Sequence, residues 1–545
     1  MSDPKARTRV STSVGSEPRA ATPFGPLAET VLGKPALGTL VLLVFAVVLA
    51  ALQVWPPEDI NWDSAWYCYA ARRVLDGAKP YIDVVDVNPP LIIYLHIPPA
   101  GLARALGWSE LLVFKGYVCL LALVSLLLSH GIMKRSALGK PPAQRRLLLL
   151  VLTYILLAGP GAAFGQREHF LLIVLVPYVL GAAARAGRAG LRGPTMFLVG
   201  LLAGLGACLK PYFLPALVVV QVYLLFGPVG RRVWRSPENI GAAVAIGLYA
   251  VHFLFLPPEV REAFVDLVRM TALTYGAYER ELRVLLEQGH TQRCLLLGLS
   301  CLLLRPVENH KHLYRVLLLT LAVLFLAAIW QLKGWRYHFL PALGAGWILA
   351  VVLFVGVLQR RRLFGELFRL APGAAVLLLA AGLFVAGLVK SVDHFGTPRY
   401  GELGPVVEAT QREAGEGPIA ALSILVNPAF PLVNYTGLDW TLRFNCLWLL
   451  PGIYAHVGPE ADPFPYSPPA EMTPVERYLI SAVVADFQAR PPTLVFVQTS
   501  PPKAINNPRF DFVTFLTRDP EFARIWSRYE FLGRIRGHVV FKRRG

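Results

Sequence analysis

The sequence predicts a polytopic α-helical membrane protein that ends in a small α/β domain outside the cytoplasm. Of its 545 residues, 55% are hydrophobic and only 16% are charged, whereas about a quarter of an ordinary soluble domain is charged. Apolar runs recur through residues 37–390. Because a bilayer core about 30 Å thick needs about 20 helical residues to cross it, these runs predict about eleven transmembrane helices.

The charge pattern narrows the class of protein further. The net charge of +18 comes mainly from short basic clusters between hydrophobic runs, which is the pattern that sets orientation in membrane proteins. No basic stripe is interleaved with aromatic residues, so we expect no nucleic-acid partner. The six cysteines have no metal-ligand spacing and four lie in apolar segments, which argues against a disulfide framework. A Cys68–Cys446 bridge stays open.

The chain starts with a polar segment, residues 1–36, which predicts a disordered cytoplasmic tail. The first apolar stretch lies too far along the chain for a cleavable signal peptide. We therefore expect it to be a retained signal anchor, so that helix 37–55 leaves the cytoplasm. The whole chain is then a multi-pass protein of the inner (plasma) membrane.

The segment 56–109 contains one apolar piece, Leu91–Leu106, that could either span the membrane or lie along its surface. If it spans, the later basic loops fall outside, against the positive-inside rule. If it is interfacial, five basic clusters fall inside, and Pro98-Pro99 supports this choice because proline disfavours a helix interior. These clusters are Lys134/Arg135/Lys140/Arg145/Arg146, Arg185/Arg188/Arg192, Arg231/Arg232/Arg235, Arg305/Lys311/Arg315 and Arg360/Arg361/Arg362.

The interfacial interpretation divides the chain into a transmembrane domain, 37–390, with a first extracytoplasmic loop at 56–109, and a domain at 391–545. The predicted membrane helices are 37–55, 110–133, 147–164, 169–186, 195–209, 212–228, 238–256, 293–305, 314–331, 338–358 and 371–390. The 293–305 segment is short, so the bilayer would thin or the neighbouring helices would tilt. An odd number of helices places the C-terminal domain outside.

The composition changes after residue 390, where proline and glycine become frequent and short strand-like runs appear. Ile419–Val426 and Thr493–Gln498 are predicted strands, and Phe531–Ile535 pairs with His538–Lys542 around Arg536-Gly537. Between them, Pro474–Ala489 has apolar residues at helical spacing. This pattern predicts a small extracytoplasmic α/β domain.

On this threading the first outer loop holds several polar side chains that could carry chemistry. It contains Asp63, Tyr67, Arg72 and Asp86, with Asp63 at the membrane edge where an amphipathic helix (64–76) begins. Asp63 could equally be a helix N-cap, or serve both purposes.

Three later outer turns add charges to the same face. The turn before helix 169–186 holds Arg167, Glu168 and His169; charges there are costly unless paired or functional, and an Arg167–Glu168 pair at a helix end is the structural alternative. Further turns supply Lys210, Lys333, Arg336 and His338, although lone interfacial cations often extend to lipid headgroups. The outer loop 257–292 is either a mobile flap or a solvated amphipathic segment.

The first outer loop resembles that of the GT-C glycosyltransferases, on the run Asp63…Tyr67…Ala70-Ala71-Arg72…Gly77…Pro80-Tyr81-Ile82-Asp83…Asn88-Pro89-Pro90-Leu91. The similarity is greatest to the bacterial relatives of protein mannosyltransferases and to the lipid A aminoarabinose transferases (glycosyltransferase family 39 and its neighbours). In those families one acidic residue begins this loop and a second lies between helices three and four, which Asp63 and Glu168 match. Ser64 stands where a glutamate is common, and Glu168 replaces the commoner aspartate.

The resemblance implies transfer of a sugar from a polyprenyl-phosphate donor to an extracytoplasmic lipid, glycan or protein, with inversion. We expect Asp63 to be the general base and Glu168 to orient the acceptor or the base, or to hold a cation. The phosphate would be stabilised by cations. The expected substrate-binding residues are Arg167, His169, Lys210, Lys333, Arg336, His338, Tyr67, Arg72 and Asp86.

Two other classes of function remain open. A transporter or flippase of envelope lipids would place polar groups near the bilayer midplane, and a non-catalytic envelope-assembly scaffold would use the C-terminal domain for binding. A different lipid-dependent transferase, such as a polymer ligase, is a third choice within the enzyme class. No metal ligands and no cofactor are predicted, and the resemblance leaves open whether a divalent cation takes part.

Overall fold

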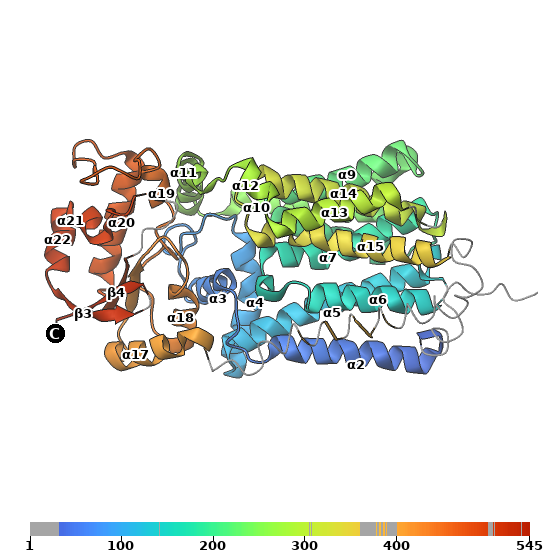
Figure 1. Cartoon of the computed structure of the whole chain (residues 1–545), viewed down its shortest axis with the longest axis horizontal. Helices are drawn as coiled ribbons and strands as arrows, with labels where there is room; N and C mark the ends of the chain where they lie inside the picture. The colour runs from blue at the N-terminus through green and yellow to red at the C-terminus, as the bar shows by residue number, and fades with distance from the viewer. Residues whose placement is uncertain are drawn as a thin grey trace, which may run out of the picture.

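The computed structural model describes residues 32–140, 142–304, 306, 308–359, 378, 381–382, 385–386, 389, 400–499, 505, 507–535 and 537–544. A long helical bundle occupies one end of the molecule and an α/β region the other (Figure 1). The bundle helices are α2 (Pro35–Val54), α5 (Glu110–Lys134), α6 (Pro142–Leu157), α7 (Arg167–Ala186), α8 (Gly193–Cys208), α9 (Leu214–Phe226), α10 (Pro237–Phe255), α13 (Gly289–Leu303), α14 (Lys311–Trp330) and α15 (Leu340–Gln359).

The length and the apolar composition of its helices make this bundle a membrane domain. Within the described residues, six helices are long and apolar enough to cross a bilayer: Pro35–Val54, Glu110–Lys134, Arg167–Ala186, Pro237–Phe255, Lys311–Trp330 and Arg336–Phe354. Gly193–Cys208 and Pro211–Phe226 are shorter apolar helices. The structure therefore confirms a polytopic helical membrane protein, while the number eleven stays a prediction. The predicted tail 1–36, the Arg360–Arg362 cluster and the helix 371–390 lie almost wholly outside the described residues.

Helix α7 forms the centre of the bundle. It is buried along nearly its whole length, because α5, α8, α14 and α15 pack around it. By contrast, α2 and α10 leave most of their apolar surface exposed, as expected of helices that face lipid. Glycines let α8 and α10 approach closely: a Cβ at Gly200 would meet the carbonyl oxygen of Glu238 at 1.8 Å.

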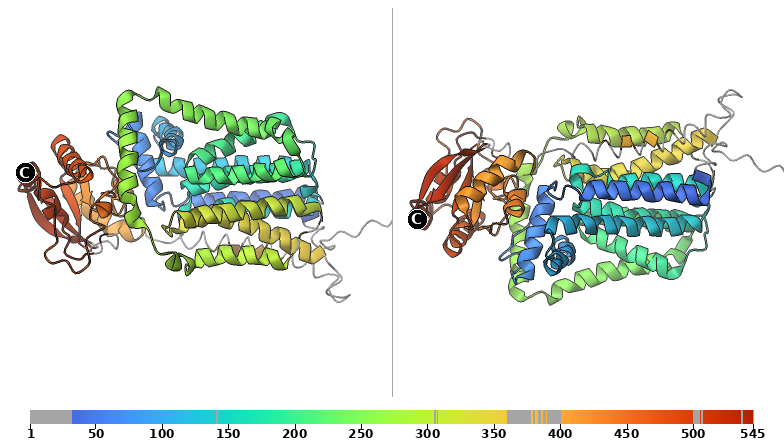
Figure 2. Two further views of the ribbon diagram at one scale, coloured as in Figure 1. Left: turned by 90° about the horizontal axis from the view of Figure 1, so that it is seen from above. Right: turned by 90° about the horizontal axis from the view of Figure 1, so that it is seen from below.

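Three helices lie across the end of the bundle rather than along it: α3 (Trp62–Leu75), α4 (Leu91–Leu106) and α11 (Pro258–Thr274). Figure 2 shows α11 crossing between the bundle and the C-terminal region, and in Figure 1 α4 runs perpendicular to α5. The transverse course of α4 agrees with the interfacial prediction. Its prolines, Pro98 and Pro99, do not break it, since both lie inside one continuous helix.

The C-terminal region contains a four-stranded sheet in the order β1-β2-β4-β3. Strand β1 (Ile419–Leu422) pairs in parallel with β2 (Leu494–Gln498), which pairs antiparallel with β4 (His538–Arg543), and β4 closes a hairpin with β3 (Tyr529–Ile535). The predicted helix appears as α20 (Pro474–Ala489). The other helices are α17 (Gly404–Ala414), α18 (Ala429–Thr436), α19 (Leu450–Ile453), α21 (Phe512–Thr517) and α22 (Pro520–Trp526). The domain boundary at 391 stays a prediction.

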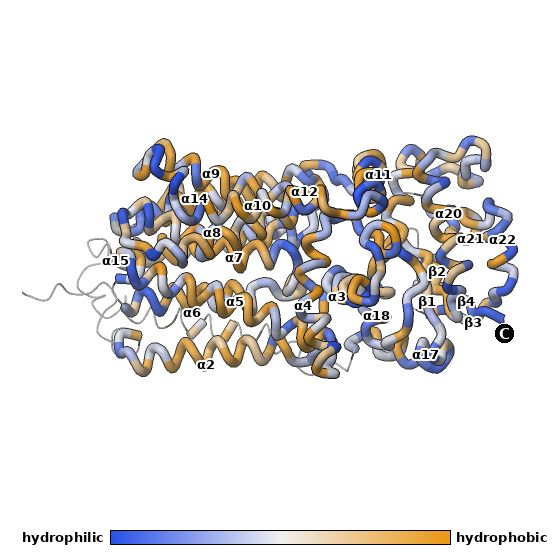
Figure 3. The backbone as a smooth tube through the Cα atoms, turned by 180° about the vertical axis from the view of Figure 1, so that it is seen from behind, coloured by the Kyte–Doolittle hydropathy of each residue, from blue (hydrophilic) through white to orange (hydrophobic). Residues whose placement is uncertain are grey.

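Hydropathy separates the two regions. The bundle is dominated by apolar residues, whereas the transverse helices and the C-terminal region alternate between apolar and polar ones (Figure 3). Cys68 and Cys446 are both free thiols, so the bridge left open by the sequence does not form here.

Candidate active site

Two predicted acidic residues each lie in the first turn of a helix, α3 for Asp63 and α7 for Glu168. A helix N-terminus stabilises negative charge through its dipole and its free amide groups. The N-cap of α3 is Asn61, whose side-chain oxygen accepts the Asp63 N–H at 2.9 Å. The N-cap interpretation of Asp63 is therefore wrong, since Asn61 fills that position and the Asp63 carboxylate is available for other contacts.

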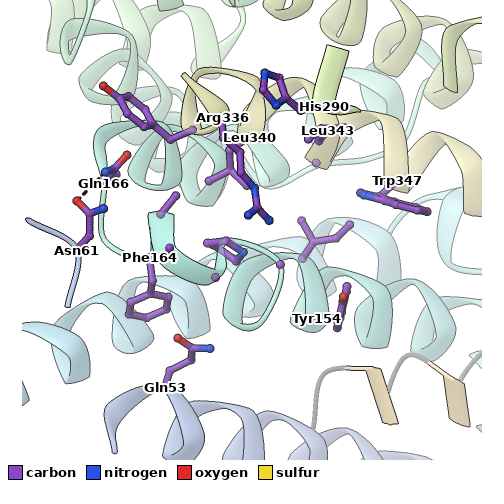
Figure 4. Close-up of a pocket in the computed structure, with 18 of the residues that line it drawn as sticks. Gln53, Asn61, Tyr154, Phe164, Gln166, His290, Arg336, Leu340, Leu343 and Trp347 are labelled. Carbon is purple, nitrogen blue, oxygen red and sulfur yellow. Dashed lines mark hydrogen bonds between the residues drawn. The ribbon is translucent and has the colours of Figure 1, made fainter. Parts of the chain in front are cut away.

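The starts of α3 and α7 are tied together by Gln166. Its amide nitrogen donates to Asn61 Oδ1 at 2.7 Å and to Asp63 Oδ2 at 3.3 Å, and Figure 4 shows the first of these bonds. Gly165 makes this turn with φ +78°, and a Cβ there would meet the Phe114 ring at 2.6 Å. Gln166 was not singled out by the sequence, because its role depends on a contact about a hundred positions away.

Glu168 pairs with a different cation from the one expected. Lys210 Nζ donates to Glu168 Oε1 at 2.5 Å, and the Glu168 side chain is fully buried. The predicted Arg167–Glu168 pair is therefore not the one that forms. Glu168 on α7 instead pairs with Lys210, in the connection between α8 and α9. His338 completes the group, with Nε2 3.4 Å from Lys210 Nζ and 4.0 Å from Glu168 Oε1. Glu168 Oε2 and His338 Nδ1 are buried and have no hydrogen-bond partner within the described residues.

The electrostatics of Asp63 and Lys210 reflect this burial. Desolvation raises the pKa of Asp63 to about 6, although the positive charge of Arg167 opposes the rise. Desolvation and the charge of Arg167 lower the pKa of Lys210 to about 8, despite its pairing with Glu168. Both groups therefore titrate much closer to neutrality than they would in water.

The other predicted residues divide into neighbours of this cluster and structural supports. The Arg167 guanidinium lies over the Tyr67 ring at 5.8 Å. Asp86 accepts from Trp66 Nε1 and from the Asn88 backbone N–H, both at 2.8 Å, so it fixes the first loop onto α3. His169 accepts from the Gly165 N–H at 3.0 Å through Nδ1, and its Nε2 lies 2.8 Å from the Leu156 carbonyl oxygen. Both ring nitrogens of His169 are therefore occupied in holding the turn before α7.

Two predicted cations do not join the cluster. Arg72 lies at the other end of α3, 3.8 Å from Glu110. Lys333 donates to the Tyr275 carbonyl oxygen at 2.6 Å and lies 3.6 Å from Glu279. It therefore anchors the segment that follows α11, namely η6 (Tyr275–Tyr278) and α12 (Leu282–Leu286). The predicted 257–292 loop is thus largely helical.

A cavity of about 1090 Å³ reaches Asn61 and Gln166, although Asp63 and Glu168 are not among the residues that line it. One part of the cavity is apolar and lies between α6 and α15, where Tyr154, Ile155, Leu343 and Trp347 line it. Its other end is polar, with Asn61 and Gln166 on one side and Arg336 on the other (Figure 4). Two further cationic or titratable groups from α13 line the cavity, His290 and Arg293. The sequence singled out neither: His290 precedes the predicted helix 293–305, and Arg293 is the first residue of that helix.

Comparison with solved structures identifies the fold. The chain is similar to ArnT from Cupriavidus metallidurans bound to undecaprenyl phosphate, at 14% identity over 93% of this chain and 97% of that one, with a TM-score of 0.51. The apo state of the same protein aligns at 14% identity over 93% and 98%, with a TM-score of 0.50. The Archaeoglobus fulgidus oligosaccharyltransferase aligns at 11% identity over 86% and 70%, with a TM-score of 0.42. No family model and no curated protein sequence matches this chain.

ArnT is a lipid A aminoarabinose transferase of the GT-C superfamily. This chain therefore has the fold that the resemblance of its first loop implies. At 14% identity the likeness shows the fold alone.

Proposed function

We propose that this protein is a membrane glycosyltransferase that moves a sugar from a polyprenyl-phosphate donor to an extracytoplasmic lipid, glycan or protein. The observation that carries the proposal is the cavity of about 1090 Å³, which is apolar between α6 and α15 and polar beside Asn61 and Gln166, the two residues that hydrogen-bond to Asp63. A long isoprenoid chain suits the apolar part, and a phosphate suits the end lined by Arg336, Arg293 and His290. ArnT, the structural neighbour, was solved with undecaprenyl phosphate bound.

In the proposed reaction, an acceptor hydroxyl or amine attacks the anomeric carbon while the bond from that carbon to the phosphate oxygen breaks. The phosphate leaves with the electron pair, and the acceptor proton passes to Asp63. A carboxylate with a pKa of about 6 suits this role, because a general base works best when its pKa is near the operating pH. A single displacement inverts the anomeric carbon.

The other members of the cluster have supporting roles in this proposal. The unpartnered Glu168 Oε2 can accept a hydrogen bond from the acceptor and orient it. Lys210 neutralises Glu168, so that a second negative charge does not oppose the departing phosphate. Arg336 is exposed in the cavity and is the cation best placed to stabilise phosphate charge. The proposal needs no metal, and the possible use of a divalent cation stays open.

The arrangement of charges also favours a transferase over a transporter. The buried pair Lys210–Glu168 lies where α7 begins, and a second pair, Arg185 with the buried Glu238, lies where α7 ends and α10 begins. Within the described helices these charges lie at helix ends and not at mid-length, where transporter sites usually occur. We propose an inner-membrane location with the N-terminus in the cytoplasm and the C-terminal domain outside.

The test is consumption of a radiolabelled polyprenyl-phosphate sugar by purified protein, compared with Asp63→Asn. We expect the variant to insert normally and to lose transfer. The control is Asp266→Asn, the same change in an exposed ion pair with Arg269 on α11, which should keep wild-type activity. Full activity of Asp63→Asn would refute the base assignment, and the absence of any donor consumption by the wild type, with a range of sugars, would refute the proposed function.

A further inference from the structure

A second cavity, of about 660 Å³, lies between the end of α3, the corner joining α4 to α5, and the C-terminal region. No residue lines both cavities. Asp63 and Arg72 are near opposite ends of α3, about 14 Å apart along a helix with 1.5 Å rise per residue. The second cavity is therefore a separate site, and the proposed transfer reaction leaves it without a role.

Charged groups of both signs line this cavity. Arg72 lies 3.8 Å from Glu110, and Arg104 lies 2.8 Å from Asp76. The arginine side chains are 38% and 70% exposed, so each retains N–H groups that can reach a ligand. The cavity thus offers arginine N–H donors for an anion. Beside them it offers carboxylates that can bind a cation.

Two residues that line this cavity each have a buried acceptor atom for which the described residues supply no donor. Glu110 Oε1 and Asn434 Oδ1 have no hydrogen-bond partner within the described residues. The amide nitrogen of Asn434 already donates to the Ala65 carbonyl oxygen at 3.1 Å, so the oxygen is the atom left for a ligand. Leaving a buried acceptor unpaired is unfavourable, and more so if it is charged. A ligand with N–H donors would remove that cost.

Exposed tryptophans indicate that this cavity lies at the level of the lipid headgroups. Trp108, which lines it, is 61% exposed, and Trp55 and Trp62 are exposed at the end of α2 and the start of α3. Exposed tryptophans mark the membrane–water interface. The exposed apolar residues Leu102 and Leu106 on α4 offer a surface for acyl chains beside it.

We propose that this cavity binds the headgroup of a phospholipid that carries a primary amine. The phosphate would contact Arg72 and Arg104, and the ammonium would donate to Glu110 Oε1 and Asn434 Oδ1. A choline headgroup has no N–H to donate, and a glycerol headgroup brings no positive charge to the carboxylates. Because Asn434 belongs to α18 and Arg72 to α3, the lipid would join the membrane domain to the C-terminal domain.

The proposal is tested by native mass spectrometry of the purified, delipidated protein mixed with phosphatidylethanolamine, its N-monomethyl and N,N-dimethyl forms, phosphatidylcholine, or phosphatidylglycerol. We expect the primary-amine lipid to be retained about tenfold more than phosphatidylcholine, which corresponds to about 1.4 kcal/mol, because phosphatidylcholine loses the charge-assisted hydrogen bonds. Retention should fall stepwise along the methylation series. This series needs no variant, so it does not depend on the folding of a mutant.

Variants then test which residue contacts the ammonium and which contacts the phosphate. Glu110→Gln should reduce the preference for the primary amine to about twofold, and Arg104→Gln should weaken every phosphate lipid alike. Glu287→Gln, the same change in an exposed pair with Arg283, should alter nothing. Equal retention of phosphatidylethanolamine and phosphatidylcholine would overturn the proposal, as would stronger retention of phosphatidylglycerol. A Glu110→Gln protein that keeps the full preference would overturn the assignment of the ammonium to Glu110.

Discussion

The raised pKa of Asp63 makes a quantitative prediction about the acid side of the pH–rate profile. A base must be ionised to act, and a carboxyl with a pKa of about 6 is about 90% ionised at pH 7 and about 10% at pH 5. The second-order rate constant for transfer, kcat/KM, should therefore fall about tenfold between these two pH values. An ordinary aspartate, with a pKa of about 3.9, would give a fall of less than about 10% over the same range.

The alkaline side tests Lys210, whose pKa is lowered to about 8. Above that value Lys210 loses its proton, the charge of Glu168 is no longer neutralised, and the negative phosphate becomes harder to expel. We expect a bell-shaped profile, measured by donor consumption in buffered detergent from pH 5 to pH 9. In Lys210→Arg the cation stays charged throughout this range, so any activity that remains should lack the alkaline limb.

An acid limb near pH 4 would contradict this prediction, because it would show that the burial of Asp63 does not govern its ionisation. An alkaline limb that persists unchanged in Lys210→Arg would assign that titration to another group. Protein stability should be followed at each pH by thermal unfolding, so that loss of the fold is distinguished from loss of the base.

Three further predictions follow from particular contacts. Lys210→Met leaves the buried Glu168 charge without its partner and should lower the free energy of unfolding by about 3–5 kcal/mol, measured by denaturation in detergent; a change below about 1 kcal/mol would contradict the pairing. Arg336→Gln should raise the KM for the donor about tenfold and leave the acceptor KM unchanged, and equal effects on both would count against a phosphate contact. Ala350→Trp fills the apolar part of the cavity and should raise the KM for a long-chain donor but not for a short-chain analogue; similar effects on both donors would place the chain elsewhere.

The sequence alone was sufficient for much of the fold, because the bilayer imposes strong rules on length and charge. Helix α5 was predicted at 110–133 and found at Glu110–Lys134, and α4 was found at the predicted Leu91–Leu106. Helical spacing of apolar residues likewise predicted α20, and two short strand-like runs around Arg536-Gly537 predicted the β3–β4 hairpin. These features depend on neighbouring residues, which the sequence shows directly.

Pairing between distant segments was decided only by the tertiary structure. The sequence placed Arg167 beside Glu168, but the packing of α7 against the α8–α9 connection gives Glu168 to Lys210. It offered Asp63 as an N-cap, while Asn61 fills that position and Gln166 holds the carboxylate. Charge counts assign a residue to one face of the membrane, whereas only the packed helices decide which groups on that face lie within hydrogen-bonding distance.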